Sequence, residues 1–288
     1  MSFAGTTAKH MMTMILPTSD SHTETLGGSM GVRKLLDLGG KVAIVTGGSR
    51  GIGLQMAEAL GEMGAKLAIT ARKQNELDDA HAHLAGMGIE CLTVAGDLSD
   101  FAAIPGIVDA VLSKHGQIDI LVNNAGCNWA APAEDYPNEA WRKVMNLNLD
   151  AQFFLAREVG KRAMIPRRSG KIINIASIAG LGGNPPEWGM QTIAYNTSKG
   201  ALIAMTRALA AEWGGANINV NAICPGFFPS KMTAVTLDRI DRRVVAMTPL
   251  ARLGGDEDLK GTVVFLASEA SRHVTGQAIA VDGGYMVI

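Results

Sequence analysis

Two residues spaced four apart could carry out proton transfer. Tyr195 and Lys199 lie in a stretch with helical spacing, and residues four apart on a helix project from the same face. An ammonium group beside a phenol stabilises the phenolate and lowers a pKa that is otherwise about 10. Tyr195 could then exchange a proton with a substrate oxygen, to which Ser177 could also hydrogen-bond. Such pairs also arise by chance on solvated helix faces, so the pair alone does not establish an active site.

A glycine-rich turn could bind an anion. The pattern predicts a short buried strand over 41–46, a tight turn over 47–51 and a helix from Ile52 onward. The first N–H groups of a helix lack internal partners, and glycines let that backbone approach a pyrophosphate. Ser49 adds a hydroxyl donor and Arg50 a charge. An ordinary glycine-rich turn is the alternative, and the spacing Gly-x-x-x-Gly-x-Gly departs from the familiar dinucleotide fingerprint.

Short apolar strands alternate with helical segments along the rest of the chain. The predicted strands span 41–46, 66–70, 90–95, 119–123, 171–176, 218–223 and 278–281. The predicted helices span 52–63, 73–87, 104–115, 139–163, 194–213, 238–247 and 257–266. This alternation predicts an α/β fold, a doubly wound, seven-stranded parallel sheet with helices on both faces. Such sheets bind ligands beyond the carboxyl ends of their strands, where the candidate polar residues fall.

The bulk composition excludes several functional classes. The chain has 288 residues, 47% of them hydrophobic and 18% charged, and a net charge of -1 with scattered Lys and Arg. This pattern gives no electrostatic footprint for nucleic acid. No apolar run is long enough to span a membrane. Cys91, Cys127 and Cys224 stand in apolar settings, which predicts reduced thiols in a reducing, cytoplasmic compartment.

The N-terminus and the histidines give two further predictions. Residues 1–37 are predicted to be a flexible N-terminal extension that precedes a single domain over 38–288. His81 and His83 lie two apart on a helix and so face apart, without neighbours that would complete a ligand set. A catalytic metal is therefore not expected.

Three motifs occur together at predicted strand ends: Thr46-Gly-x-x-x-Gly-Ile-Gly53, Asn123-Asn-Ala-Gly126 and Tyr195-x-x-x-Lys199. Jointly they resemble the short-chain dehydrogenase/reductase family, over residues from about 38 to 288. The flanking residues look most like its gluconate 5-dehydrogenase and 3-oxoacyl-thioester reductase branches. The resemblance implies a Rossmann fold, a nicotinamide cofactor, a small carbonyl or alcohol substrate and a homotetramer.

The resemblance also implies a role for each catalytic residue. Tyr195 would be the general acid/base, and Lys199 would hold the nicotinamide ribose and depress the tyrosine pKa. Ser177 would orient the substrate, and Asn148 would anchor a water in a proton relay. Asn146 is an alternative register for that asparagine.

The cofactor would lie along the strand ends, and its contacts follow from the same resemblance. Asp97 and Leu98 would hold the adenine, and Asn124, Ala125 and Gly126 would line the adenosine ribose. The carboxamide of the nicotinamide would contact the segment after the sixth predicted strand, from Pro225 to Phe228. The implied set is Gly47, Ser49, Arg50, Gly51, Ile52, Gly53, Arg72, Asp97, Leu98, Asn124, Ala125, Gly126, Tyr195, Lys199, Pro225, Gly226, Phe228 and Ser230.

Charge after the second strand predicts which cofactor binds. A carboxylate there binds the ribose 2′-hydroxyl of NAD, whereas a 2′-phosphate favours arginine. The chain has Arg72 there, no acid in the adjoining segment 70–73, and Arg50 in the glycine turn beside it. The expected cofactor is therefore NADP(H), with NAD(H) less favoured.

The sequence is compatible with more than one class of substrate. Trp129, Phe227 and the long loop before Tyr195 predict a partly aromatic entrance, which favours an acyl chain such as a 3-oxoacyl thioester. Asn184, Glu187 and Gln191 could equally bind sugar hydroxyls, as in a sugar-acid dehydrogenase. A catalytically silent cofactor-binding scaffold is the alternative from another class.

Overall fold

The structure, a computed structural model, describes residues 30–185, 188–229 and 242–288. Its compact unit runs from Val32 to Ile288. The unit begins with a short helix, α1 (Val32–Leu36), which lies within the segment that the sequence pattern assigns to the extension. Leu38, just after it, is buried and its N–H donates to the Met63 carbonyl oxygen. Leu36 packs against the same core, so these two leucines attach this end of the described chain to the body of the fold.

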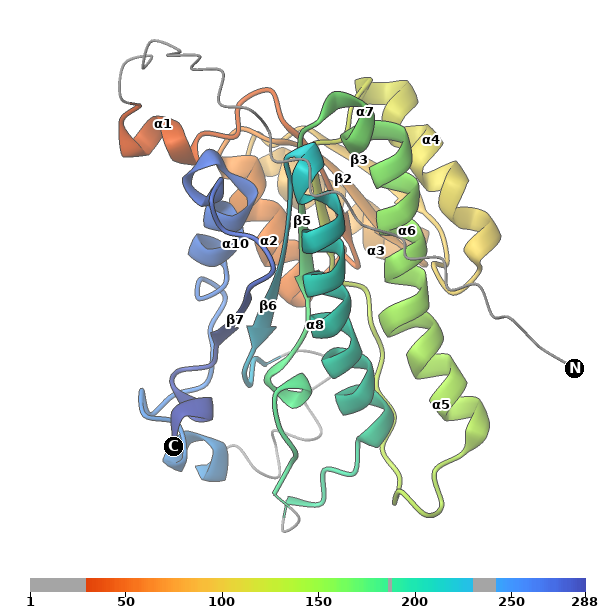
Figure 1. Cartoon of the computed structure of the whole chain (residues 1–288), viewed down its shortest axis with the longest axis vertical. Coiled ribbons are helices and arrows are strands. Elements are labelled where there is room, and N and C mark those ends of the chain that lie inside the picture. The colour runs from red at the N-terminus through yellow and green to blue at the C-terminus, as the bar shows by residue number, and fades with distance from the viewer. Residues whose placement is uncertain (1–29, 186–187, 230–241) are drawn as a thin grey trace, which may run out of the picture. The chain divides into compact units, whose positions relative to one another are not determined.

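Seven parallel strands form one sheet (Figure 1). They are β1 (Val42–Thr46), β2 (Lys66–Ala71), β3 (Cys91–Ala95), β4 (Ile120–Asn123), β5 (Gly170–Ile175), β6 (Ile218–Pro225) and β7 (Ala278–Val281). Their order is β3-β2-β1-β4-β5-β6-β7, so the sheet grows first to one side of β1 and then, from β4, to the other. The predicted doubly wound, seven-stranded fold is confirmed. A crevice is expected where the order reverses, beyond the ends of β1 and β4.

Helices cover both faces of the sheet (Figure 1). On one face lie α2 (Gly51–Glu62), α3 (Gln74–Gly86) and α10 (Lys260–Ala267), which share a buried cluster with the strands. On the other lie α4 (Ile104–His115), α6 (Ala151–Val159) and α8 (Ile193–Trp213). Both faces of the sheet are therefore buried. This explains why the strands are continuous runs of apolar residues, without alternation between apolar and polar residues.

The helix predicted over 139–163 is interrupted. It forms as α5 (Asn138–Met145) and α6, with a π-helical turn over Asn146–Asp150 between them and a second over Gly160–Met164 before α7 (Ile165–Arg167). The second turn contains Gly160, where a Cβ would lie 2.8 Å from the Trp213 ring of α8. The first contains Asn148. Apolar periodicity does not reveal π-turns, which are enriched at functional sites.

The helix predicted from residue 257 begins three residues later. The Asp258 carboxylate accepts hydrogen bonds from Arg252 and from the Gly255 N–H, which keeps residues 256–259 in a turn. The helix predicted over 238–247 is only partly described, and residues 242–246 of it are helical. None of the helices in the described ranges is long and apolar enough to cross a membrane.

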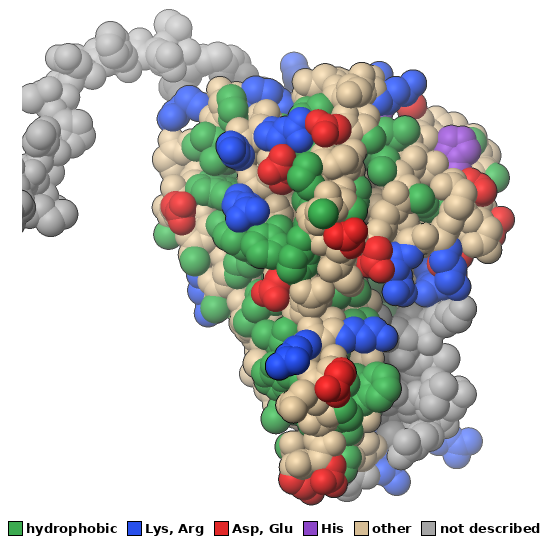
Figure 2. All heavy atoms as spheres, turned by 90° about the vertical axis from the view of Figure 1, so that its right-hand side faces the viewer, with side chains coloured by type: hydrophobic (Ala, Val, Ile, Leu, Met, Phe, Trp, Pro, Cys, Tyr) green, Lys and Arg blue, Asp and Glu red, His purple; other side chains and the backbone are tan. Residues whose placement is uncertain are grey.

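One outer face, which carries α4, α5 and α6, shows hydrophobic side chains between charged ones (Figure 2). Trp141 is 36% exposed, and Phe153 and Phe154 are partly buried. The Arg157 guanidinium lies 4.9 Å from the centre of the Phe154 ring. This aromatic face is therefore only partly covered within one chain.

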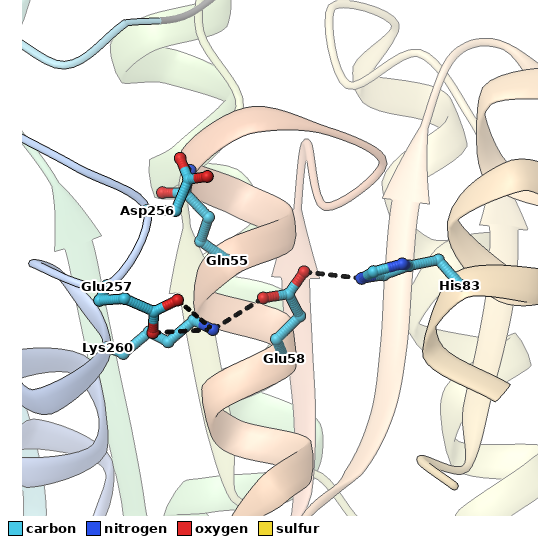
Figure 3. Close-up of polar contacts among 6 residues, drawn as sticks. All are labelled: Gln55, Glu58, His83, Asp256, Glu257 and Lys260. Atoms are coloured by element: carbon cyan, nitrogen blue, oxygen red, sulfur yellow. Dashed lines mark hydrogen bonds and ion pairs between the residues drawn. The ribbon is translucent and has the colours of Figure 1, made fainter. Parts of the chain in front are cut away.

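An ion-pair network joins three helices on the opposite side of the sheet (Figure 3). Glu58 of α2 lies 2.8 Å from the His83 Nε2 of α3 and 2.9 Å from the Lys260 Nζ of α10. Lys260 also lies 3.1 Å from Glu257. Burial opposes ionisation of Glu58, but the hydrogen bonds from Lys260 and His83 outweigh it and lower the pKa of Glu58. His83 thus has an ion-pair partner, and in the described part of the chain no three His, Cys, Asp or Glu side chains gather as a metal site.

Glu58→Gln is expected to destabilise the fold by about 1 kcal/mol at about pH 7, because it removes the shared carboxylate of a network. A carboxylate with a lowered pKa contributes stability above its ordinary pKa of 4.5 and loses it as pH falls through the folded value. The deficit should therefore shrink as the pH falls below 4.5, which urea unfolding at about pH 7 and about pH 3 measures. Glu257→Gln is the matched control, because that side chain is 79% exposed and should change little. An equal deficit at both pH values would contradict the electrostatic account.

Candidate active site

The glycine turn after β1 has a conformation that side chains would block. Gly47 and Gly51 have φ values of +62° and +54°, which residues with a Cβ rarely adopt. A Cβ on Gly53 would lie 2.2 Å from the Gly47 carbonyl oxygen. The turn leads directly into α2, so the first N–H groups of that helix border it. Ser49 is buried in the turn, and Ile52 packs against the core. This cradle fits a pyrophosphate.

The loop after β4 braces the same turn. The Thr46 hydroxyl accepts hydrogen bonds from the N–H groups of Asn124 (2.8 Å) and Ala125 (2.9 Å). The Asn124 side chain donates to the Thr46 carbonyl oxygen (2.8 Å) and to that of Gly47 (3.2 Å). Sequence reasoning placed Thr46 in a motif without assigning it a contact. Since the Asn124 side chain faces the turn, the surface that this loop offers a ribose is mainly backbone.

The predicted 2′-phosphate site holds an unexpected acid. Arg50 Nη1 lies 2.6 Å from Glu76 Oε1, and Lys73 Nζ lies 3.3 Å from the same oxygen. Glu76 stands in the first turn of α3, five residues after the end of β2. Arg72 is exposed. The structure therefore pairs Arg50, together with Lys73, with a carboxylate that the segment 70–73 does not contain.

The segment after β3 forms a tight turn. The Asp97 carboxylate accepts a hydrogen bond from the Ser99 N–H at 2.9 Å, and Leu98 is buried. Asn146 donates to the Ser99 carbonyl oxygen at 3.1 Å. Asn146 therefore supports this turn, and the alternative register for the relay asparagine is not favoured.

Asn148 is fully buried, and both the amide nitrogen and the amide oxygen of its side chain form hydrogen bonds. Its amide donates to the Cys127 carbonyl oxygen (2.9 Å) and to Ser198 Oγ (3.1 Å), and its Oδ1 accepts from the Cys127 N–H (2.8 Å). A Cβ on Gly126 would lie 3.2 Å from that Oδ1. Ser198 Oγ donates in turn to the Tyr195 carbonyl oxygen at 2.8 Å. The side chain thus positions the loop after β4 against α8, and a water-anchoring role remains a prediction.

Ser177, Tyr195 and Lys199 come together beside this loop. Ser177 hydrogen-bonds the Tyr195 side chain, and its Oγ also accepts from the Ala179 N–H at 3.1 Å. Lys199 Nζ lies 5.6 Å from the centre of the Tyr195 ring and donates to the Ile175 carbonyl oxygen at 2.6 Å. The phenol and the ammonium therefore project to the same side of α8, as the spacing predicts.

The predicted lowering of the Tyr195 pKa is wrong. Burial raises the pKa of Tyr195 above 10, against the opposing effect of the Ser177 hydrogen bond. Burial also lowers the pKa of Lys199 to about 8, against the Cys224 and Cys127 thiols, which favour its charge. Burial, which sequence spacing does not show, outweighs the Ser177 hydrogen bond at this phenol. At neutral pH the phenol is therefore a protonated group, suited to donate a proton.

The segment after β6 separates into two faces. The Gly226 N–H donates to the Val281 carbonyl oxygen at 3.0 Å, so Pro225 and Gly226 lie at the carboxyl end of β6, beside the end of β7. The Phe228 side chain is buried in the core against Gly254, so only its backbone could meet a carboxamide. Ser230 lies outside the described residues.

A cavity of about 100 Å³, open to solvent, lies beside Tyr195 and Ser177. Its apolar lining comes from Ile178, Met190, Phe227, Tyr285 and Met286. Its polar lining comes from Asn128, Asn184 and Thr192, besides Ser177 and Tyr195. Among the described residues, no charged side chain lines it. The cavity combines a proton donor with a largely apolar wall.

The predicted entrance residues divide between this wall and other positions. Trp129 is 46% exposed and is not part of the lining, and Gln191 is exposed outside it. Glu187 lies outside the described residues. Trp188 is buried, and its ring centre lies 5.9 Å from Phe227 and 6.1 Å from Tyr285. It therefore supports the cavity wall from behind.

Tyr285 and Met286 are lining residues that sequence reasoning missed. They follow β7, the last strand, by four and five residues. Their only signal in the sequence is position, because segments after parallel strands gather at one edge of the sheet.

Comparison with known proteins identifies the family of the chain. A family model described as enoyl-(acyl carrier protein) reductase (adh_short_C2) matches residues 47–286. The chain is 37% identical over 255 residues to gluconate 5-dehydrogenase of Gluconobacter oxydans, covering 88% of this chain and 97% of that protein. It is 38% identical over 255 residues to the rhamnolipids biosynthesis 3-oxoacyl-[acyl-carrier-protein] reductase of Pseudomonas aeruginosa, covering 86% and 97%.

A solved structure adds a fold match. The crystal structure of a gluconate 5-dehydrogenase from Burkholderia cenocepacia in complex with NADP and tartrate superposes with a TM-score of 0.84 at 32% identity, covering 90% of this chain and 100% of that one. The motifs, the doubly wound sheet and these matches agree, and the chain belongs to the short-chain dehydrogenase/reductase family of NAD(P)-dependent oxidoreductases.

Proposed function

We propose that the chain interconverts a ketone and a secondary alcohol with NADP(H) as cofactor. The observation that carries the proposal is the Tyr195 hydroxyl, hydrogen-bonded to Ser177 and facing a cavity at the carboxyl end of the sheet. A related structure in complex with NADP supports the choice of cofactor. When bound, the dinucleotide supplies or accepts the hydride.

The chain's own residues would bind the dinucleotide along the strand ends. Gly47, Gly51 and Gly53 leave the space that a pyrophosphate needs. Arg50 and Arg72 would hold the 2′-phosphate, since guanidinium groups match phosphate geometry.

The proton chemistry favours reduction. A phenol whose pKa burial raises is protonated at neutral pH, so Tyr195 can donate its proton to the carbonyl oxygen as that oxygen gains negative charge. Ser177 would hydrogen-bond the same oxygen and hold it in place. Lys199, fixed by the Ile175 carbonyl oxygen, would place its positive charge beside the phenolate that forms and so stabilise it.

The cavity favours a ketone with an apolar arm, such as a 3-oxoacyl thioester. Two of its polar side chains already have hydrogen-bond partners: Asn184 donates to Thr192 Oγ1 (3.0 Å), which donates to Asn196 Oδ1 (2.8 Å). A sugar acid would bring a carboxylate, which cationic side chains bind best, and none of the described residues lining the cavity is cationic.

A sugar-acid ketone is the second candidate. The amide and hydroxyl groups of Asn128, Asn184 and Thr192 favour it, since they line the cavity and could exchange partners with sugar hydroxyls. The gluconate 5-dehydrogenase relative supports the same class.

A substrate panel separates the two classes. NADPH oxidation should be followed with 3-oxoacyl thioesters of increasing chain length, with keto-sugar acids and with simple diketones. We expect kcat/KM to rise with chain length, because each buried methylene contributes about 0.8 kcal/mol. A higher kcat/KM for the keto-sugar acids would overturn the acyl assignment and leave the reaction class intact.

We also propose that the chain forms a homotetramer. The incompletely covered aromatic face on α5 and α6 supports an interface there (Figure 2). Light scattering coupled to size exclusion tests this, and a mass near 30.2 kDa, that of one chain, would contradict it.

Two further proposals concern the chain's surroundings. Cys91, Cys127 and Cys224 are all free, which supports a reducing, cytoplasmic location. We propose that residues 1–37 form an extension to a catalytic domain over 38–288, with α1 as the part of that extension that belongs to the compact unit. Limited proteolysis tests that boundary, and protection of residues 1–30 would count against it.

A further inference from the structure

A single carboxylate pairs with one of the two arginines expected to bind the 2′-phosphate. Glu76 Oε1 lies 2.6 Å from Arg50 Nη1 and 3.3 Å from Lys73 Nζ. The Glu76 side chain is only 22% exposed, whereas that of Arg50 is 52% exposed. The acid is thus the more fixed partner, and the arginine is the one that can turn away from it.

The three residues come from elements that meet at the cofactor edge of the sheet. Arg50 is the residue before α2, at the end of the glycine turn. Lys73 precedes α3, and Glu76 stands in its first turn. Arg72 forms no ion pair with another described residue. Burial raises the pKa of Cys127, while the charges of Lys143 and Arg72 oppose this increase.

We propose that Glu76 is a specificity-determining residue that limits the preference for NADP(H) over NAD(H). The inference rests on the proposed NADP(H) site. To bind Arg50, a 2′-phosphate must break the Arg50–Glu76 ion pair, and it then lies close to the Glu76 carboxylate, which repels it. Both effects weaken binding of the phosphorylated cofactor. NAD(H) brings no phosphate there, so the Arg50–Glu76 pair stays intact and its binding is not penalised.

The direct test is Glu76→Gln, which keeps the shape and removes the charge. We expect the Kd of NADPH, followed by the change in nicotinamide fluorescence, to fall by about three- to tenfold. The Kd of NADH should stay within about twofold, because the variant changes no group that NADH must displace. Glu90→Gln is the matched control: it removes the same charge from an exposed ion pair, with Lys66, at the opposite end of β3.

A double-mutant cycle tests the mechanism apart from any effect on folding. Arg50→Ala leaves Glu76 without this guanidinium near the phosphate, so NADPH should bind more weakly than to the wild type. Adding Glu76→Gln to Arg50→Ala should recover part of that loss. Calorimetry with adenosine 2′,5′-bisphosphate and with AMP should show the same pattern without the nicotinamide. The gain in affinity that Glu76→Gln gives the 2′-phosphorylated ligand should shrink at high salt, because salt screens the repulsion that the variant removes.

The outcomes separate the inference from the function on which it rests. Wild-type protein that binds neither NADPH nor NADH would overturn the proposed function. Wild-type protein that binds NADPH, together with a Glu76→Gln variant whose NADPH-to-NADH Kd ratio is unchanged or moves toward NADH, would overturn the role of Glu76 alone.

Discussion

Tyr195→Phe is expected to lower kcat by about 100- to 10,000-fold, the range that a positioned general acid contributes. The substitution removes the hydroxyl that hydrogen-bonds Ser177 and keeps the ring that lies beside Lys199. The Kd of NADPH should therefore change little. Steady-state kinetics with the best ketone of the panel, together with a fluorescence titration of NADPH, measure the two effects separately.

Tyr136→Phe is the matched control for this variant. Tyr136 also lies on a loop near the crevice, but its hydroxyl donates to the Trp129 carbonyl oxygen at 3.1 Å and the residue does not line the cavity. Its kcat should stay within about twofold of the wild type, as for surface changes. Unchanged turnover in Tyr195→Phe would refute the proton-donor role. Wild-type protein that binds NADPH but reduces no ketone would favour the silent scaffold.

Gly53→Ala is expected to damage both stability and cofactor binding. The new methyl group would lie 2.2 Å from the Gly47 carbonyl oxygen and 2.5 Å from Asn124 Nδ2, so the turn must move. Overpacking of this kind costs about 1–3 kcal/mol, and contact with backbone places it at the upper end. Because the displaced atoms form the pyrophosphate cradle, the Kd of NADPH should rise by more than about tenfold, equivalent to about 1.4 kcal/mol.

Gly261→Ala is the control for that substitution. Gly261 also lies near the start of a helix, α10, but a Cβ there would meet no atom within 4 Å. Alanine is the better helix former by up to about 1 kcal/mol, so this variant should be as stable as the wild type or slightly more. Urea unfolding and NADPH titration of both variants provide the comparison. Equal behaviour of the two would mean that the cradle tolerates a side chain.

The fold could be predicted because its signals are local. The strands are buried runs such as Val42–Thr46, and each lies within a few residues of its predicted bounds. The helix predicted over 104–115 has the same bounds in the structure. Interruptions were missed where their cause is distant in sequence, as at Gly160, which makes room for Trp213. A hydrophobic period does not contain that information.

The site was predicted in its residues more than in its electrostatics. Motif order brought Ser177, Tyr195 and Lys199 together, as the structure does. The sign of the tyrosine pKa shift was wrong because it depends on burial, which spacing cannot give. Glu76 was missed for a related reason: its pairing with Arg50 joins two helices that are adjacent only in the folded chain.

The contacts of Asn148 have a consequence for preorganisation. One amide links the loop after β4, through Ser198, to the turn of α8 that carries the acid. The Asn148–Ser198 hydrogen bond that joins these two regions is buried, so neither region can move without breaking it. The entropy of aligning them is therefore paid during folding, and each catalytic cycle starts with the proton donor already in register with the nucleotide crevice.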